Sequence, residues 1–304
     1  METQGPNTRA PVVAAFDAAT GVREPVEFGI AASDVTGAPL IIAVVHTGDE
    51  ESSLEQLRAD LQRRGLDEVE IRTFKDRTAA RGLARALDEV QPALIVLGSS
   101  KRSAIGSVFV GTTAERVIHA SSCPVAVVPK GYERPEGGVK VIGAAYSPSD
   151  EGREALHAAA SLARAGGARV RAIMVLDPSH AGEQSSSMMA EQHHITSPSE
   201  GDAAVHRLSD EAELNEVVAK LGVDAEADVL VADAADGLVA ASQNVDLLIM
   251  GSRGLGPKRA VLLGSVSRRV AERSACPVVI LPRGATEKTE ALLADAEAHA
   301  AGQG

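Results

Sequence analysis

Tryptophan is absent from this chain of 304 residues, and aromatic residues together make up only 2% of it. Its hydrophobic cores must therefore consist of alanine, valine, leucine and isoleucine, which supply most of the 44% hydrophobic content. Aliphatic cores of this kind suit parallel strands that are buried on both faces of a sheet. The composition therefore favours an α/β protein.

Long apolar runs and positive charge are also scarce. No run approaches the roughly 18 apolar residues of a transmembrane helix, so we expect no membrane span. With 42 acidic and 30 basic residues the net charge is −12, which argues against nucleic acid or an anionic membrane as a partner. The N-terminal segment METQGPNTRAP has no apolar signal core, so we expect a cytoplasmic protein.

The chain repeats itself. Residues 94–131 align without gaps with residues 247–284 at an offset of 153. The alignment pairs Gly98 with Gly251, Gly111 with Gly264, Cys123 with Cys276, and Pro129 with Pro282. Two repeats of this length indicate a tandem duplication of a whole domain rather than a solenoid.

Each half alternates short apolar runs with helical patterns, which predicts a parallel sheet. In the first half the predicted strands are residues 12–16, 40–46, 69–74, 93–97 and 125–128. In the second half they are residues 139–146, 169–176, 228–233, 245–250 and 278–281. The fold class is therefore α/β, with two tandem doubly wound, five-stranded parallel-sheet domains that are Rossmann-like.

Composition also predicts the domain boundaries. The expected segments are a disordered N-terminus (1–10), a first domain (11–130), a linker (131–138), a second domain (139–284) and a C-terminal tail (285–304). Residues 178–204 are polar and serine-rich, and we expect a flexible insertion there. Its adjacent His193 and His194 would make a poor metal site, so no metal site is predicted. The Ala/Glu-rich tail is expected to form a frayed helix, and it contains no recognisable catalytic or binding residues.

The stretch GSRGLGPKRAVLLGS, residues 251–265, has the features of an anion-binding loop. It follows a predicted strand, and Gly251 and Gly254 let the backbone approach a ligand. Gly264 and Ser265 open a helix whose unpaired N–H groups and dipole favour phosphate oxygens. The spacing G-x2-G-x9-G-S is neither the Walker A pattern nor G-x-G-x-x-G. A plain strand–helix turn with permissive glycines is the alternative.

This loop resembles the nucleotide loop of the universal stress protein family, in its ATP-binding subgroup, and so do the preceding strand and the closing segment CPVVILP (276–282). The resemblance covers about residues 11–284. It implies a fold related to adenine nucleotide α-hydrolases, an adenine nucleotide as ligand (ATP, with or without Mg²⁺), and a role as a stress-response regulator or sensor.

The family pocket combines the glycine loop with an acid at the end of the first strand, and this chain divides the two parts between its domains. In the second domain the loop is complete, but Tyr146 is expected where the first domain has Asp17; an aromatic ring there could stack on adenine. The residues expected to bind the nucleotide in this domain are Tyr146, Met250, Gly251, Ser252, Arg253, Gly254, Gly264, Ser265 and Val266.

The first domain keeps Asp17, but Lys101 replaces the second glycine of the loop. Lys101 either fills the phosphate volume or contacts phosphate itself. Asp17 could equally be a helix-capping acid. The residues of this weaker expected site are Asp17, Gly98, Lys101, Gly111 and Thr112.

The sequence contains no recognisable arrangement of nucleophile, base and acid, so we expect no enzyme activity beyond slow ATP hydrolysis. Cys123 and Cys276 are expected to be buried and structural. Two alternatives remain open: a nucleotide-free interaction scaffold, and an enzyme of the adenine-nucleotide α-hydrolase type.

The last strand of each domain, 125–128 and 278–281, is entirely apolar. Exposed apolar edge strands need cover. Because the family commonly dimerises through its last strand, we expect the two to pair within the chain as a pseudo-dimer, and a homodimer also remains open.

Overall fold

The computed structural model describes residues 9–46, 51–99, 112–177, 200–252 and 263–303. The elements of the first half are β1 (Val12–Phe16), α1 (Glu24–Thr36), β2 (Leu40–His46), α2 (Glu51–Arg63), β3 (Glu70–Lys75), α3 (Ala79–Val90), β4 (Leu94–Gly98), α4 (Thr112–Ala120) and β5 (Val125–Val128). Those of the second half are β6 (Val141–Tyr146), α5 (Asp150–Gly166), β7 (Arg169–Leu176), α6 (Glu200–Ala219), β8 (Ala225–Val231), α7 (Ala234–Ala241), the short 3-10 turn η1 (Ser242–Asn244), β9 (Leu247–Gly251), α8 (Ser265–Arg273) and β10 (Val278–Leu281). One further helix, α9 (Thr286–Gln303), follows.

The described strands form one sheet of ten, in the order β3-β2-β1-β4-β5-β10-β9-β6-β7-β8. Within each half all strand pairs are parallel. The strand order of the second half is the mirror of that of the first. The predicted α/β class and the two five-stranded parallel sets are therefore confirmed, but the two sets are continuous with each other.

The continuity comes from β5 and β10, which pair antiparallel. Val278 lies opposite Val127, Val279 opposite Ala126, and Ile280 opposite Val125. All residues of both strands are buried. The expectation that the two last strands pair within the chain is confirmed by this register, and neither strand is left as an apolar edge.

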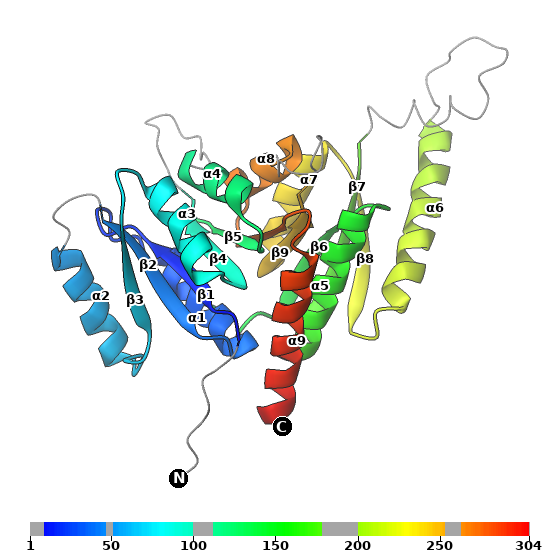
Figure 1. Cartoon of the computed structure of the whole chain (residues 1–304). Coiled ribbons are helices and arrows are strands. Elements are labelled where there is room, and N and C mark those ends of the chain that lie inside the picture. Colours follow the sequence, from blue (N-terminus) through cyan, green and yellow to red (C-terminus); the bar gives the residue numbers. More distant parts are fainter. Residues whose placement is uncertain (1–8, 47–50, 100–111, 178–199, 253–262, 304) are drawn as a thin grey trace.

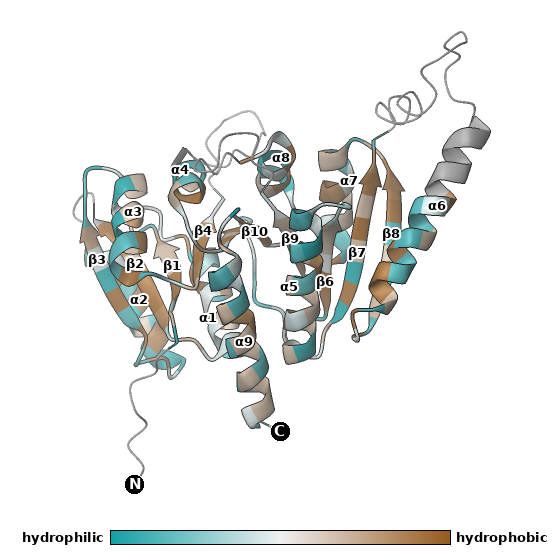
Figure 2. Cartoon of the chain, turned by 45° about the vertical axis from the view of Figure 1, so that its right-hand side comes forward, coloured by the Kyte–Doolittle hydropathy of each residue, from teal (hydrophilic) through white to brown (hydrophobic). Residues whose placement is uncertain are grey.

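Helices cover both faces of the sheet (Figure 1). One core lies under α1, α2, α5, α6 and α9, and the other lies under α3, α4, α7 and α8. Successive strand residues alternate between them: Leu247 and Ile249 of β9 belong to the first core, whereas Leu248 and Met250 belong to the second. The strands are accordingly largely brown in Figure 2, where the outer sides of the helices carry the teal, hydrophilic residues. Among the described helices, none is long and apolar enough to cross a membrane.

Two segments are more ordered than the sequence suggested. α6 begins at Glu200, so residues 200–204, which we assigned to the flexible insertion, open a helix; residues 178–199, with His193 and His194, lie outside the described part of the chain. The tail forms α9, which packs beside α5 and α1 rather than fraying. Figure 1 shows α9 in red alongside α5 in green.

α9 joins the two halves through polar contacts as well as packing. Lys288 Nζ donates to Gln91 Oε1 at 3.1 Å and to Ser122 Oγ at 3.2 Å, and both acceptors belong to the first half. Asp295 pairs with Arg9 near the N-terminus at 3.4 Å. The helix thus crosses from the second half, to which it is covalently attached, onto the first.

Leu292 tests how much this helix contributes to stability. It is 7% exposed and lies in the core shared with α1 and α5. We expect Leu292→Ala to lower the free energy of unfolding by about 2–4 kcal/mol, because it removes buried apolar volume and leaves a cavity. Urea denaturation followed by circular dichroism measures the change. Leu293→Ala is the matched control on the same helix, since Leu293 is only partly buried and should cost less. Equal losses from the two variants would contradict the assigned inner face of α9.

Candidate functional site

The sheet has two points where the chain changes the direction in which it adds strands. They lie between β1 and β4 in the first half and between β6 and β9 in the second. Open parallel sheets bind ligands outside the carboxyl ends of the strands at such points. Asp17 and Gly98 reach the first of these points, and the loop that begins at Gly251 leaves the second. The fold therefore brings Asp17, Gly98 and Gly251 to the two positions where such sheets bind ligands.

The strand registers correct one of our alignments. Val12 of β1 lies opposite Leu94, and Ile142 of β6 lies opposite Leu247, which is the repeat equivalent of Leu94. Val12 therefore corresponds to Ile142, so the counterpart of Asp17 is Ser147. The assignment of Tyr146 to the position of Asp17 was wrong by one residue.

Tyr146 corresponds instead to Phe16, and both rings are buried in the core under α1 and α5, at 6% and 3% exposure. A ring packed there is part of the core rather than an aromatic surface at the mouth of the site. Met250 is likewise buried, at 4% exposure, in the opposite core. The hydroxyl of Ser147 meets that of Ser149, 2.9 Å away, and Ser149 caps α5.

Gly251 is a glycine for a reason that we did not anticipate. Its φ is not positive. A Cβ at this position would lie 2.6 Å from Cβ of Glu151 and 3.2 Å from its carbonyl oxygen, so the first turn of α5 occupies the space. Glu151 forms a short ion pair with Arg283, which follows β10. Its own backbone N–H, and then Arg283, hold the pKa of Glu151 below its usual value.

Ser252 carries the least satisfied group of this site. Ser252 is only 1% exposed, yet its Oγ has no hydrogen-bond partner among the described residues. Its backbone N–H is used, because it donates to the Leu281 carbonyl at 2.9 Å. A buried hydroxyl without a partner is costly, which is the property expected of a group that meets a ligand.

α8 brings its first turn to the same place. Ser267 Oγ donates to the Gly251 carbonyl at 3.2 Å, and this contact joins the helix to the end of β9. The N-cap residue is Gly264, and no side chain caps the helix, so Ser265 is its first exposed residue rather than the cap. Val266 is partly buried against the core. Arg253 and Gly254 lie outside the described residues.

The first turn of α8 therefore offers backbone N–H groups without a side-chain acceptor, next to an unpartnered hydroxyl. This donor set fits the oxygens of a phosphate group. We refer to Ser147, Gly251, Ser252, Gly264 and Ser265 as the second-half site. Two features of this site were not predicted from the sequence: the place of Ser147 and the contact of Ser267 with the Gly251 carbonyl. Both depend on the strand register and on the position of α8, which the sequence does not reveal.

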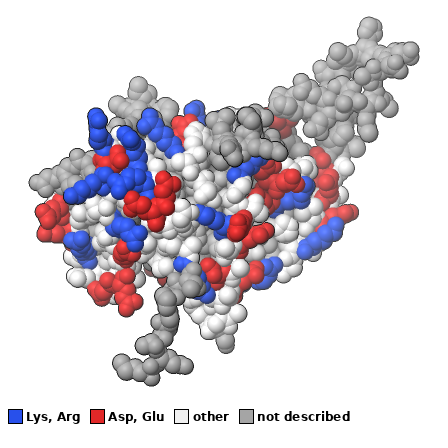
Figure 3. Space-filling view, in the orientation of Figure 1, with Lys and Arg blue, Asp and Glu red and all other residues white. Residues whose placement is uncertain are grey.

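The basic side chains of α8 form ion pairs with nearby carboxylates. Arg269 donates to Asp233 at 3.0 Å and to Asp236 at 3.1 Å, and this hydrogen bonding lowers the pKa of Asp233. Arg268 pairs with Glu272 on the same helix. Acidic and basic side chains are interspersed in this way over the described part of the face in Figure 3. Among the described residues, attraction of an anion to the start of α8 would therefore come mainly from the backbone.

In the first half, Asp17 lies in an exposed turn. Its carboxylate accepts from Ala19 N at 3.1 Å and from Thr20 Oγ1 at 2.8 Å. It does not cap α1, whose N-cap residue is Arg23, so the helix-capping alternative is wrong. Gly98 ends β4 beside Pro25. Thr112 begins α4, whereas Lys101 and Gly111 lie outside the described residues.

The two cysteines have no catalytic environment. Both are buried, and neither forms a disulfide. Burial raises the pKa of Cys276 to about 11 and raises the pKa of Cys123 as well, so both thiols stay protonated at neutral pH. Their expected burial is confirmed.

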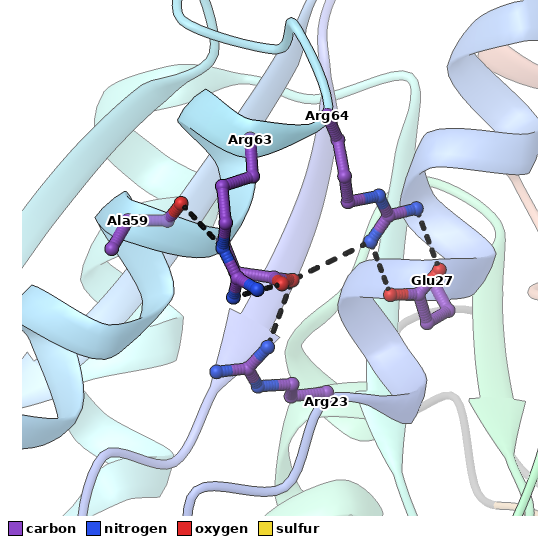
Figure 4. Close-up of polar contacts among 6 residues, drawn as sticks. Arg23, Glu27, Ala59, Arg63 and Arg64 are labelled. Carbon is purple, nitrogen blue, oxygen red and sulfur yellow. Dashed lines mark hydrogen bonds and ion pairs between the residues drawn. The ribbon is translucent and has the colours of Figure 1, made fainter.

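A separate hollow of about 690 Å³ lies beside the linker between β5 and β6. Glu27, Arg64, Tyr132 and residues 133–138 line it. Two of its charged groups pair with each other: Arg64 donates to both oxygens of Glu27 at 2.6 and 3.0 Å, in the network drawn in Figure 4. Burial raises the pKa of Tyr132 to about 12. The geometry suits a packed linker rather than an anion site.

Comparison with known proteins shows which family the sequence and the fold resemble. The sequence profile of the Universal stress protein family matches residues 12–129 and 138–282. A universal stress protein of Mycobacterium tuberculosis is 28% identical over 223 residues, covering 71% of this chain and 73% of the relative. One from Thermus aquaticus is 32% identical over 146 residues, covering 47% of this chain and 98% of the relative.

Solved structures show the same fold. A functionally unknown protein from Pseudomonas aeruginosa PAO1 matches with a TM-score of 0.66 at 15% identity, over 94% of this chain and 98% of the other. A universal stress protein from Archaeoglobus fulgidus matches with a TM-score of 0.62 at 18% identity, over 91% and 100%. Because the family profile matches the chain twice and spans most of its length, the chain belongs to the universal stress protein family, with two copies of the family domain in tandem.

Proposed function

We propose that this protein binds ATP at the second-half site and acts as a regulator or sensor in a stress response, not as an enzyme. Residues 11–130 and 139–284 are the two functional domains of this proposal, joined by the linker 131–138. They act together as an intramolecular pseudo-dimer.

The observation that carries the proposal is the buried Ser252 hydroxyl, which lacks a partner among the described residues. It lies directly after β9, where α8 presents a first turn without a side-chain cap. A phosphate oxygen would satisfy both groups, and hydrogen bonds to charged groups are worth about 1.5–3 kcal/mol each. The G-x2-G-x9-G-S spacing of the loop supports the same ligand.

Each part of the second-half site has a role in this proposal. The backbone N–H groups of the first turn of α8 and the Ser252 and Ser265 hydroxyls would hold phosphate oxygens. Ser147 would take the place of the strand-end acid on the adenosine side, as a neutral group that can donate or accept. The Glu151–Arg283 pair closes the α5 side of Gly251 without leaving net charge there.

The first half would bind nucleotide weakly or not at all. Asp17 already accepts two local hydrogen bonds. Lys101 replaces the glycine that corresponds to Gly254. Mg²⁺ can accompany ATP without a dedicated cage, because it is bound largely by phosphate oxygens and water. In the described part of the chain, no group of three or more His, Cys, Asp or Glu residues could hold a metal.

Regulation would follow from linkage. A ligand that binds only the folded form stabilises that form by about 2.7 kcal/mol at a hundredfold excess over its dissociation constant. The response would be a shift between conformations or assembly states, and hydrolysis would be slow because the proposed site has no general base.

Stoichiometry tests the assignment to one half. We expect one tightly bound ATP per chain by isothermal titration calorimetry. Gly254→Lys copies the residue of the first half into the second and should weaken binding about a hundredfold or more, because it obstructs at least two phosphate contacts. The reciprocal variant Lys101→Gly is the matched control and should leave the tight site unchanged. Two equivalent sites, or unaltered affinity in Gly254→Lys, would contradict the assignment.

Ser252→Ala separates binding from folding. Removing a buried hydroxyl that lacks a partner should leave the melting temperature of the ligand-free protein unchanged or raise it. The same change should weaken ATP binding about tenfold to a hundredfold, because one hydrogen bond to a charged phosphate oxygen is lost. Thermal melts with and without ATP measure both effects. Ser267→Ala is the control, since the Ser267 hydroxyl already donates to Gly251. A variant that loses stability without ATP and keeps full affinity would exclude Ser252 from the site.

Equilibrium dialysis decides between the proposed function and its nucleotide-free alternative. Purified protein that retains no ATP at millimolar concentrations would be an interaction scaffold, whose activity depends on the duplicated fold alone. Product formed from ATP well above the buffer background would instead favour an adenine-nucleotide α-hydrolase.

A further inference from the structure

One hydrogen bond crosses from the first half to the second-half site. His119 lies in the last turn of α4, and its Nε2 accepts a hydrogen bond from the backbone N–H of Leu263 at 3.2 Å. The two residues are 144 positions apart in the chain. Leu263 immediately precedes Gly264, the N-cap residue of α8.

The contact is specific in its chemistry. A ring nitrogen that accepts a hydrogen bond carries no proton, so the proton of the neutral ring lies on Nδ1. His119 and Leu263 are both partly buried, and this protects the bond from competition with water. Leu263 also packs against the core that contains Val117 and Ile118 of α4. The end of α4 thus holds the backbone of Leu263, while the Leu263 side chain packs against the core on the same face of the sheet.

The two halves are not equivalent in this respect. At the repeat offset of 153, the counterpart of His119 is Glu272. Glu272 pairs with Arg268 on its own helix at 3.6 Å. A neutral imidazole therefore faces the loop of the second half, whereas the matching position of the second half holds a carboxylate engaged within α8.

We propose that His119 is a positioning residue of the nucleotide site in the other half of the chain. By accepting from Leu263 it fixes the backbone next to Gly264, and so it sets where the first turn of α8 presents its N–H groups. The inference rests on the proposed function for its ligand. It goes further by making the second-half site depend on a side chain of the first half.

Three full-length variants test the proposal. His119→Phe keeps a ring and removes the acceptor. His119→Gln places a side-chain oxygen near the position of Nε2 and should restore the bond. His157→Phe, at an exposed histidine on α5, is the control for loss of a histidine. Circular dichroism melts confirm that each variant folds.

The first measurement needs no nucleotide. Amide hydrogen exchange at Leu263, followed by NMR, should be about fivefold to tenfold faster in His119→Phe than in the wild type, because one hydrogen bond is lost. His119→Gln and His157→Phe should exchange at the wild-type rate. Equal rates in all four proteins would overturn the positioning role, whether or not the protein binds ATP.

The second measurement is ATP affinity by calorimetry. His119→Phe should bind ATP about fivefold to tenfold more weakly, with recovery in His119→Gln. Faster exchange with unchanged affinity would also overturn the proposal, because the contact would then hold Leu263 without setting the site. A wild-type protein that binds no ATP would end the proposed function, while the exchange rates would still decide whether His119 orders the start of α8.

Discussion

The antiparallel ladder between β5 and β10 determines the arrangement of the whole molecule. Three residue pairs, all buried, turn two sheets of five strands into one of ten. The pairing brings α4 and α8 onto the same face, where His119 reaches Leu263. On the other face it brings α1 near α5, and α9 packs against both. Each contact between the halves described above follows from this one register.

Much of the fold was predictable because the sequence carries it locally. The apolar runs at Val125–Val128 and Arg169–Leu176 match β5 and β7 at both ends. The repeat itself identified equivalent loops and cysteines. The role of α9 was not predictable, because Leu292 packs into a core whose other buried members come mostly from helices and strands far away along the chain. An Ala/Glu-rich helix has no strong pattern of its own, and only tertiary packing selects its buried face.

The sequence predicted where the loop of the candidate site lies, but not which side chains surround it. The glycine spacing located the end of β9 and the start of α8. The first strands of the two halves share no glycine at a matching position, and a slip of one residue moved the comparison from Ser147 to Tyr146, which exchanges one face of the strand for the other. Close packing of Glu151 on Gly251, and the acceptor supplied by His119, join residues that are a hundred or more positions apart along the chain. No local pattern reports such contacts.

Placing both partners of the β5–β10 ladder on one polypeptide also changes how the interface responds to dilution. Two separate chains would form such a ladder only above their dissociation constant. Here the short linker holds the partners at an effective concentration on the order of millimolar, which does not fall when the protein becomes scarce. The interface, with the His119 contact that lies over it, therefore forms equally in a cell that contains few copies of the protein and in one that contains many. Each copy therefore carries this interface as soon as it has folded.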